Sequence, residues 1–188
     1  DANISPTSGN LLSDGFLQYD RGPERVAHRI SNGIWNFNDK LVRLAADSNR
    51  AVRFQVVAEL LGQQRRFVLK ADNFEGPRPL PADKCVQVSR VWYVRGKHGR
   101  EVDGWWDSPP SLVPVFKPVL VPSEDNPVPG QTNQAFVVTI HIPKLVLSGV
   151  YKTMLHITDL DDPTYEEHIR VEVAARPDGR KMRSVVGE

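Results

Sequence analysis

The sequence lacks several features that would identify its chemistry directly. Cys85 is the only cysteine in 188 residues, so neither an intrachain disulfide nor a cysteine-based zinc or redox site is possible. No apolar run reaches the roughly 18 residues that a membrane-spanning helix needs. Lys and Arg number 24 against 23 Asp and Glu, giving a net charge of +1 and no basic footprint for nucleic acid. We therefore expect no nucleic-acid partner and no membrane insertion.

The length excludes a further class, because a (β/α)₈ barrel enzyme needs roughly 250 residues. The chain begins Asp1-Ala2-Asn3-Ile4, without an initiator methionine and without the basic-then-apolar layout of a signal peptide. We interpret this as a trimmed terminus.

The strongest pattern that is present is an alternation of apolar and polar residues, which is typical of β-strands. Strands are predicted at 136–142, where the even positions are apolar, and at 151–157 and 169–173. A further strand is predicted at 86–94, with Val86, Val88, Trp92 and Val94 on one face. Other strands are predicted near 25–30, 40–45 and 66–70. With seven or more short strands and no secure helix, the sequence predicts an all-β fold. We expect an immunoglobulin-like β-sandwich with extra strands.

The segment from Asn49 to Leu61 fits two structures. Val52, Val56, Val57 and Leu60 would share one face of a helix, whereas every second residue from Val52 to Leu60 is also apolar. The Val and Phe content favours a strand.

Seven of the fifteen prolines lie between Trp105 and Gln131. Proline fixes φ and lacks the N–H that a sheet ladder needs, so we predict a long irregular, edge-like strap there. With no flexible linker or repeat in the chain, we expect one domain over residues 1–176. Residues 177–188 are predicted to be an exit linker or disordered tail.

A turn signal at Asp159–Thr164 separates the last two strands, which predicts an antiparallel hairpin. A register symmetric about residue 162 places Tyr151 opposite Val173 on the buried face. On the other face it places Lys152 opposite Glu172 and His156 opposite His168.

The candidate binding residues surround Gly104-Trp105-Trp106-Asp107. Tryptophan rings stack on the apolar faces of sugars, and nearby polar groups can hold hydroxyls. The residues that would form such a site are Trp105, Trp106, Asp103, Asp107, His98 and Arg100. The alternatives are that these tryptophans plug the end of the sandwich or contact a following domain. Trp35 and Trp92 are predicted to pack in the core.

Two clusters resemble metal sites, but the sequence favours neither. Asp159, Asp161, Asp162, Glu166 and Glu167 lack EF-hand spacing, so we predict a solvated turn rather than a calcium site. His156, His168 and His141 would need a further ligand to bind zinc, and we predict an exposed polar face. No catalytic spacing or phosphate-binding loop is found, so no catalytic residue, metal or cofactor is expected.

Three segments resemble a known accessory domain. The segment Asn49–Val57 is similar to the motif NE-x-x-x-FQ-V, Gly130–Lys144 is similar to AG-x-NQ-x-x-W-V-x-V-x-VP, and Gly149–Thr153 is similar to PG-x-Y-x-G. These motifs belong to the non-catalytic N-terminal β-sandwich domain of family 123 glycoside hydrolases and their uncharacterised relatives. Arg50 and Phe136 depart from the family's usual Glu and Trp.

The resemblance implies an accessory domain of an exported carbohydrate-active protein, located outside the cell or in the periplasm. The family's catalytic carboxylates reside in a barrel that this sequence does not contain, so we expect no enzymatic activity of the chain itself. The expected partner is a neighbouring catalytic domain, braced by the strap and one sheet face. The alternative is a polysaccharide, bound as by a carbohydrate-binding module.

Overall fold

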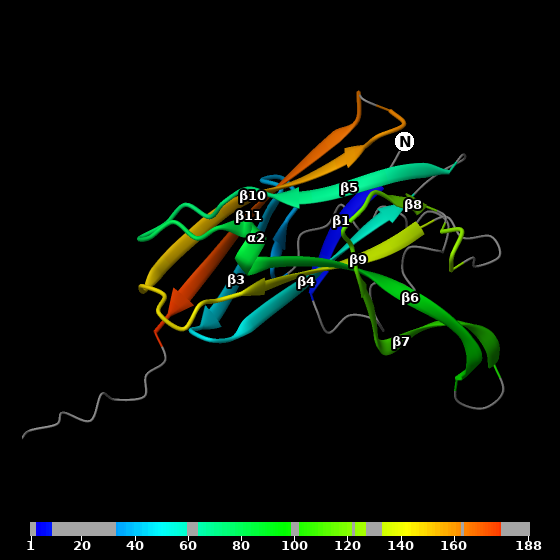
Figure 1. Cartoon of the computed structure of the whole chain (residues 1–188), viewed down its shortest axis with the longest axis horizontal. Helices are drawn as coiled ribbons and strands as arrows, with labels where there is room; N and C mark the ends of the chain where they lie inside the picture. Colours follow the sequence, from blue (N-terminus) through cyan, green and yellow to red (C-terminus); the bar gives the residue numbers. More distant parts are fainter. Residues whose placement is uncertain are drawn as a thin grey trace, which may run out of the picture.

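A computed structural model describes residues 3–8, 33–59, 64–98, 102–121, 123–126, 133–162 and 164–177 as two β-sheets packed face to face (Figure 1). The first sheet has the order β1 (Asn3–Ser8), β4 (Ala51–Glu59), β9 (Asn133–His141), β6 (Val86–His98) and β7 (Val102–Pro114). The second has the order β2 (Trp35–Asn36), β3 (Leu41–Asp47), β11 (Glu166–Arg176), β10 (Gly149–Asp159), β5 (Arg65–Ala71) and β8 (Val119–Val121). The predicted all-β, immunoglobulin-like sandwich is confirmed.

Helix is scarce in the described part of the chain. A single turn, α2 (Ala82–Cys85), precedes β6. None of the described helices is long and apolar enough to cross a membrane.

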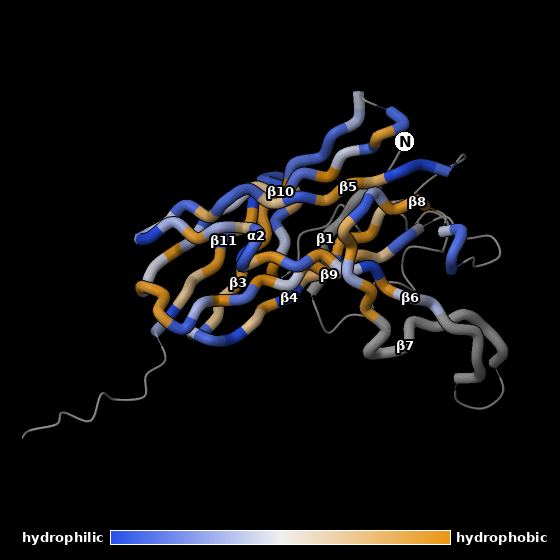
Figure 2. The backbone as a smooth tube through the Cα atoms, in the orientation of Figure 1, coloured by the Kyte–Doolittle hydropathy of each residue, from blue (hydrophilic) through white to orange (hydrophobic). Residues whose placement is uncertain are grey.

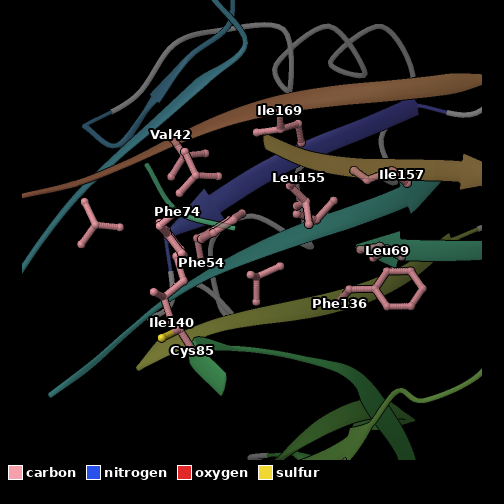
Figure 3. Close-up of a cluster of buried hydrophobic side chains, with 14 of the residues drawn as sticks. Val42, Phe54, Leu69, Phe74, Cys85, Phe136, Ile140, Leu155, Ile157 and Ile169 are labelled. Carbon is pink, nitrogen blue, oxygen red and sulfur yellow. The ribbon is translucent and has the colours of Figure 1, made fainter. Parts of the chain in front are cut away.

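The core fills the space between the two sheets (Figure 3). Phe54 of β4 and Phe136 of β9 face Leu155 of β10 and Ile169 of β11, and all four are at most 1% exposed. Burying each such side chain contributes about 1.5–3 kcal/mol to folding. Trp35 belongs to the same core, as predicted. Cys85 is also buried there, and its burial raises the pKa of the thiol.

β4 resolves the ambiguity over residues 49–61 in favour of the strand. From Phe54 to Ala58 both of its faces are covered, which the alternation did not indicate. Phe54 points into the main core, while Val57, on the other face, joins a second cluster with Tyr93 and Val137. β4 lies between β1 and β9 rather than at an edge, so polar Gln55 is buried as well.

β6 departs from the predicted single apolar face. Val86 and Val88 pack against the main core, but farther along the strand the buried residues are Val91 and Tyr93. The pairing with β7 shifts register between these two residues. Trp92 is only half-buried, with the guanidinium carbon of Arg90 5.0 Å from its ring centre, so its predicted core position is wrong.

The strap prediction is corrected in one respect. The chain from Trp105 onward is not irregular but continues as β7 to Pro114, and Val119–Val121 forms β8. Both strands lie at sheet edges, where proline's missing N–H costs no ladder hydrogen bond. The strand predicted near 25–30, and residues 178–188 of the predicted tail, lie outside the described residues.

The last hairpin has the predicted register throughout. β10 and β11 pair antiparallel and symmetrically about residue 162, with Tyr151 opposite Val173 and His156 opposite His168. The cross-strand ion pair is also present, with Lys152 Nζ 3.6 Å from a Glu172 carboxylate oxygen.

Candidate functional site

The tryptophan segment lies on an edge hairpin. The backbone of β7 pairs Trp105 with Arg95 and Trp106 with Val94 of β6, and the hairpin extends away from the sandwich (Figure 1). The same ladder places Asp107 opposite Tyr93, Asp103 opposite Lys97, and His98 opposite Val102. The side chains of these predicted site residues, and all of Arg100, lie outside the described part of the structure. Sugar contact by this segment therefore stays a prediction.

Arg90 lines a groove beside this hairpin and makes several hydrogen bonds there. Its guanidinium donates to both carboxylate oxygens of Asp125, and one of its nitrogens lies 2.9 Å from the Ser123 hydroxyl. The hydrogen bond from Arg90 holds the pKa of Asp125 well below its usual range. Phe116, 90% exposed, lies on the groove's wall. Sequence reasoning missed this site because Arg90 and Asp125 are 35 residues apart.

The acidic turn exposes Leu160 and Asp161 to solvent, as expected, but two arginines of β5 also pair with its carboxylates. Arg65 donates to Asp159 at 2.8 Å and to Asp162 at 3.2 Å, and Arg66 pairs with Asp161. Asp159 is completely buried. Its carboxylate also accepts the backbone N–H groups of Asp161 and Asp162. This arrangement is structural, and no local pattern in the sequence indicated that β5 would lie beside the turn.

Next to this turn, the hairpin brings two histidines together. Nδ1 of His156 lies 3.1 Å from Nδ1 of His168, and the ring planes are nearly perpendicular. Glu166 provides a third group, with Oε1 3.5 Å from Nδ1 of His156. His141 is not part of the cluster, because it lies on β9 in the other sheet.

The fourth member of the cluster comes from a distant part of the sequence. Oδ2 of Asp72, directly after β5, lies 2.9 Å from Nε2 of His156. This hydrogen bond is the main reason why the pKa of His156 is raised above its ordinary value. The parity of the strands predicted that the histidines would face each other, but only the order of strands in the sheet brings Asp72 beside them.

The last feature is an exposed apolar surface at one end of the sandwich. Six large hydrophobic side chains are exposed in the described structure, and three of them, Leu145, Leu147 and Val150, lie within six residues. We call these three residues the apolar end patch. They lie in the β9–β10 connection and at the start of β10. The tube of this connection includes an orange, hydrophobic stretch (Figure 2). Val146 between them is buried and anchors the loop to the main core.

The apolar end patch lies where β11 ends. Val150 pairs with Ala174 in the ladder, two residues before the last residue of β11, Arg176. The β3–β4 turn is at the same end, since Ser48 donates its backbone N–H to the carbonyl of Arg176.

No protein-family model and no curated protein sequence matches the chain. Among solved structures, the chain is similar to a family 123 glycoside hydrolase from Clostridium perfringens, studied for its hydrolysis of glycolipid glycans. The TM-score is 0.66 at 11% sequence identity, covering 95% of this chain. The chain spans only 28% of the length of that enzyme.

Two further structures are more distant, each with a TM-score of 0.38. One is PapD-like domain 7 of human CEP192, at 11% identity over 74% of this chain and 83% of that chain. The other is the periplasmic chaperone SfaE, at 8% identity over 73% of this chain and 54% of that chain. The similarity to the glycoside hydrolase supports the predicted resemblance at the level of the fold.

Proposed function

We propose that the chain is a non-catalytic accessory domain of an exported carbohydrate-active protein, and that it braces a neighbouring catalytic domain of the same polypeptide through the apolar end patch. The observation that carries this proposal is the exposure of Leu145 and Leu147, which are 81% and 52% exposed in one short loop. Clustered exposed apolar side chains mark interaction surfaces more often than scattered ones do.

Two further observations support the proposal. β11 ends beside the apolar end patch, so a segment that follows it in the chain starts close to this surface. A glycoside hydrolase more than three times as long contains a region of the same fold, which supports a sandwich of this kind serving as one part of a larger enzyme.

The test replaces both leucines of the patch in the complete polypeptide and in this 188-residue chain. Leu145→Ser with Leu147→Ser is expected to lower the melting temperature of the complete polypeptide while leaving the isolated chain nearly unchanged. Leu160→Ser is the matched control, because Leu160 is also exposed, at 44%, but lies in the turn at the other end of β10. Equal effects of the patch and control variants on the complete polypeptide would refute the proposal.

A second candidate function is binding of a polysaccharide by the β6–β7 hairpin. Its support is the placement of Trp105 and Trp106 on an edge strand, where no other described strand pairs with one side of the backbone. Consecutive residues of a strand belong to opposite faces, so the two residues need separate variants. Loss of retention on immobilised polysaccharide in Trp105→Ala or Trp106→Ala, with Trp92→Ala unaffected, would favour this function. No retention of the unmodified chain on any polysaccharide would exclude it.

A further inference from the structure

The register of the β10–β11 hairpin brings together a group of side chains that does not correspond to any local sequence motif. His156 and His168 are opposite each other in the β10–β11 ladder. Glu166 precedes His168 by two residues and therefore shares its face of the strand. Ligand atoms of these three residues all lie within 4.8 Å of one another.

Two of the three distances between ligand atoms are close to those of a tetrahedral zinc site. Two nitrogens bound to one zinc ion at about 2.0–2.1 Å are about 3.3 Å apart when the geometry is tetrahedral. The two Nδ1 atoms are 3.1 Å apart, and Nδ1 of His156 is 3.5 Å from Oε1 of Glu166. All three ligand atoms lie within 4.8 Å of one another, so a shift of the exposed Glu166 and His168 side chains would bring the three atoms around one ion.

Asp72 supplies the supporting contact that such a site needs. Histidines that bind metals usually donate their other ring N–H to a carboxylate, which fixes the tautomer. A carboxylate only accepts hydrogen bonds, so the 2.9 Å contact to Asp72 places the proton of neutral His156 on Nε2. The lone pair of Nδ1 then faces His168 and Glu166.

Charge and exposure also fit a bound divalent ion. The carboxylates of Glu166 and Asp72 offset its two positive charges, while Lys70, opposite His156 on β5, adds one opposing charge. His168 and Glu166 side chains are 48% and 47% exposed, so an ion can enter and keep a water ligand. Two imidazole nitrogens favour zinc over calcium or magnesium, which prefer oxygen ligands.

We propose that His156, His168 and Glu166 bind a zinc ion, with Asp72 orienting His156 and water completing the coordination. The ion links β10 to β11 and, through Asp72, to the segment that follows β5. This proposal does not depend on the proposed accessory function, because the histidines lie near the turn of the β10–β11 hairpin, whereas the apolar end patch lies at the hairpin's other end.

The test is a titration of the metal-free 188-residue chain with Co²⁺ at neutral pH, followed by displacement with Zn²⁺. One equivalent of Co²⁺ is expected to bind with the visible absorption of tetrahedral cobalt, and Zn²⁺ is expected to abolish it. His156→Ala and His168→Ala are expected to lose this absorption. Asp72→Asn is expected to weaken binding about 10–100-fold, the usual effect of losing such a supporting carboxylate.

His141→Ala is the matched control, since His141 is an exposed histidine on the other sheet. It is expected to bind Co²⁺ as the unmodified chain does. Far-UV circular dichroism identifies any variant that fails to fold. Lys70→Gln preserves every ligand and removes the opposing positive charge, so it is expected to tighten Co²⁺ binding. Failure of the unmodified chain to bind Co²⁺ at millimolar concentration, or an equal loss in His141→Ala, would overturn the proposal.

Discussion

The buried carboxylate of Asp159 provides a sharp test of how the last hairpin is held. It is fully buried at the end of β10 and accepts three hydrogen bonds, one from Arg65 and two from backbone N–H groups of the turn. Asp159→Ala removes all three. It also leaves the Arg65 guanidinium, whose side chain is 30% exposed, with Asp162 as its one remaining acidic partner among the described residues.

The expected loss of stability in Asp159→Ala follows from this geometry. Breaking a buried ion pair by removing one partner costs about 3–5 kcal/mol. The lower end applies here because Arg65 keeps Asp162 at 3.2 Å and reaches solvent. We therefore expect Asp159→Ala to reduce the free energy of unfolding by about 3 kcal/mol. For a chain of this size that loss lowers the melting temperature by about 6–12 °C.

The assay is urea unfolding followed by tryptophan fluorescence, with Asp161→Ala as the matched control. Asp161 is paired with the neighbouring arginine, Arg66, but is exposed. Asp161→Ala should therefore reduce the free energy of unfolding much less than Asp159→Ala does. If Asp159→Ala is no more destabilising than Asp161→Ala, burial is not what makes the Arg65 pair important, and the reasoning is wrong.

Three further predictions concern other parts of the chain. Gly149 has φ of +150°, and a Cβ there would lie 2.5 Å from Cγ of Pro77, so Gly149→Ala should destabilise the fold by about 1–3 kcal/mol in urea unfolding. Asp125 has a lowered pKa beside Arg90, so its contribution to stability is complete above its unfolded pKa and is lost as the pH falls below about 4. Asp125→Asn should therefore flatten the decline in stability at acid pH, measured by urea unfolding across the acid range. Zinc at about 100 times its dissociation constant should stabilise the unmodified chain by about 2.7 kcal/mol in thermal unfolding, and an unchanged melting temperature would contradict this.

The parts of the fold that were predictable depend on local pattern. The alternation and the turn signal together determined the pairing of β10 with β11 down to individual residues, including Lys152 with Glu172. The same alternation gave β4 its strand, but it could not indicate that Gln55 would be buried. That burial depends on both neighbouring strands and on what covers the outer face of the sheet.

The parts that were missed depend on contacts between distant segments. The prolines of β7 suggested an irregular strap, yet an edge strand tolerates proline because one side of its backbone needs no partner. Arg65 reaches Asp159 across 94 residues, and Asp72 reaches His156 across 84. No local periodicity encodes these contacts, because they arise from β5 pairing with β10 in the second sheet.

The central claim is that the apolar end patch is covered by a neighbouring domain in the complete protein. Amide hydrogen exchange across residues 145–150 tests this directly when the isolated chain is compared with the complete gene product from its native cells. The account predicts a product much larger than the 21.1 kDa chain and slower exchange in this loop within it. A native product of about the size of this chain, or equal exchange in both forms, would contradict the account.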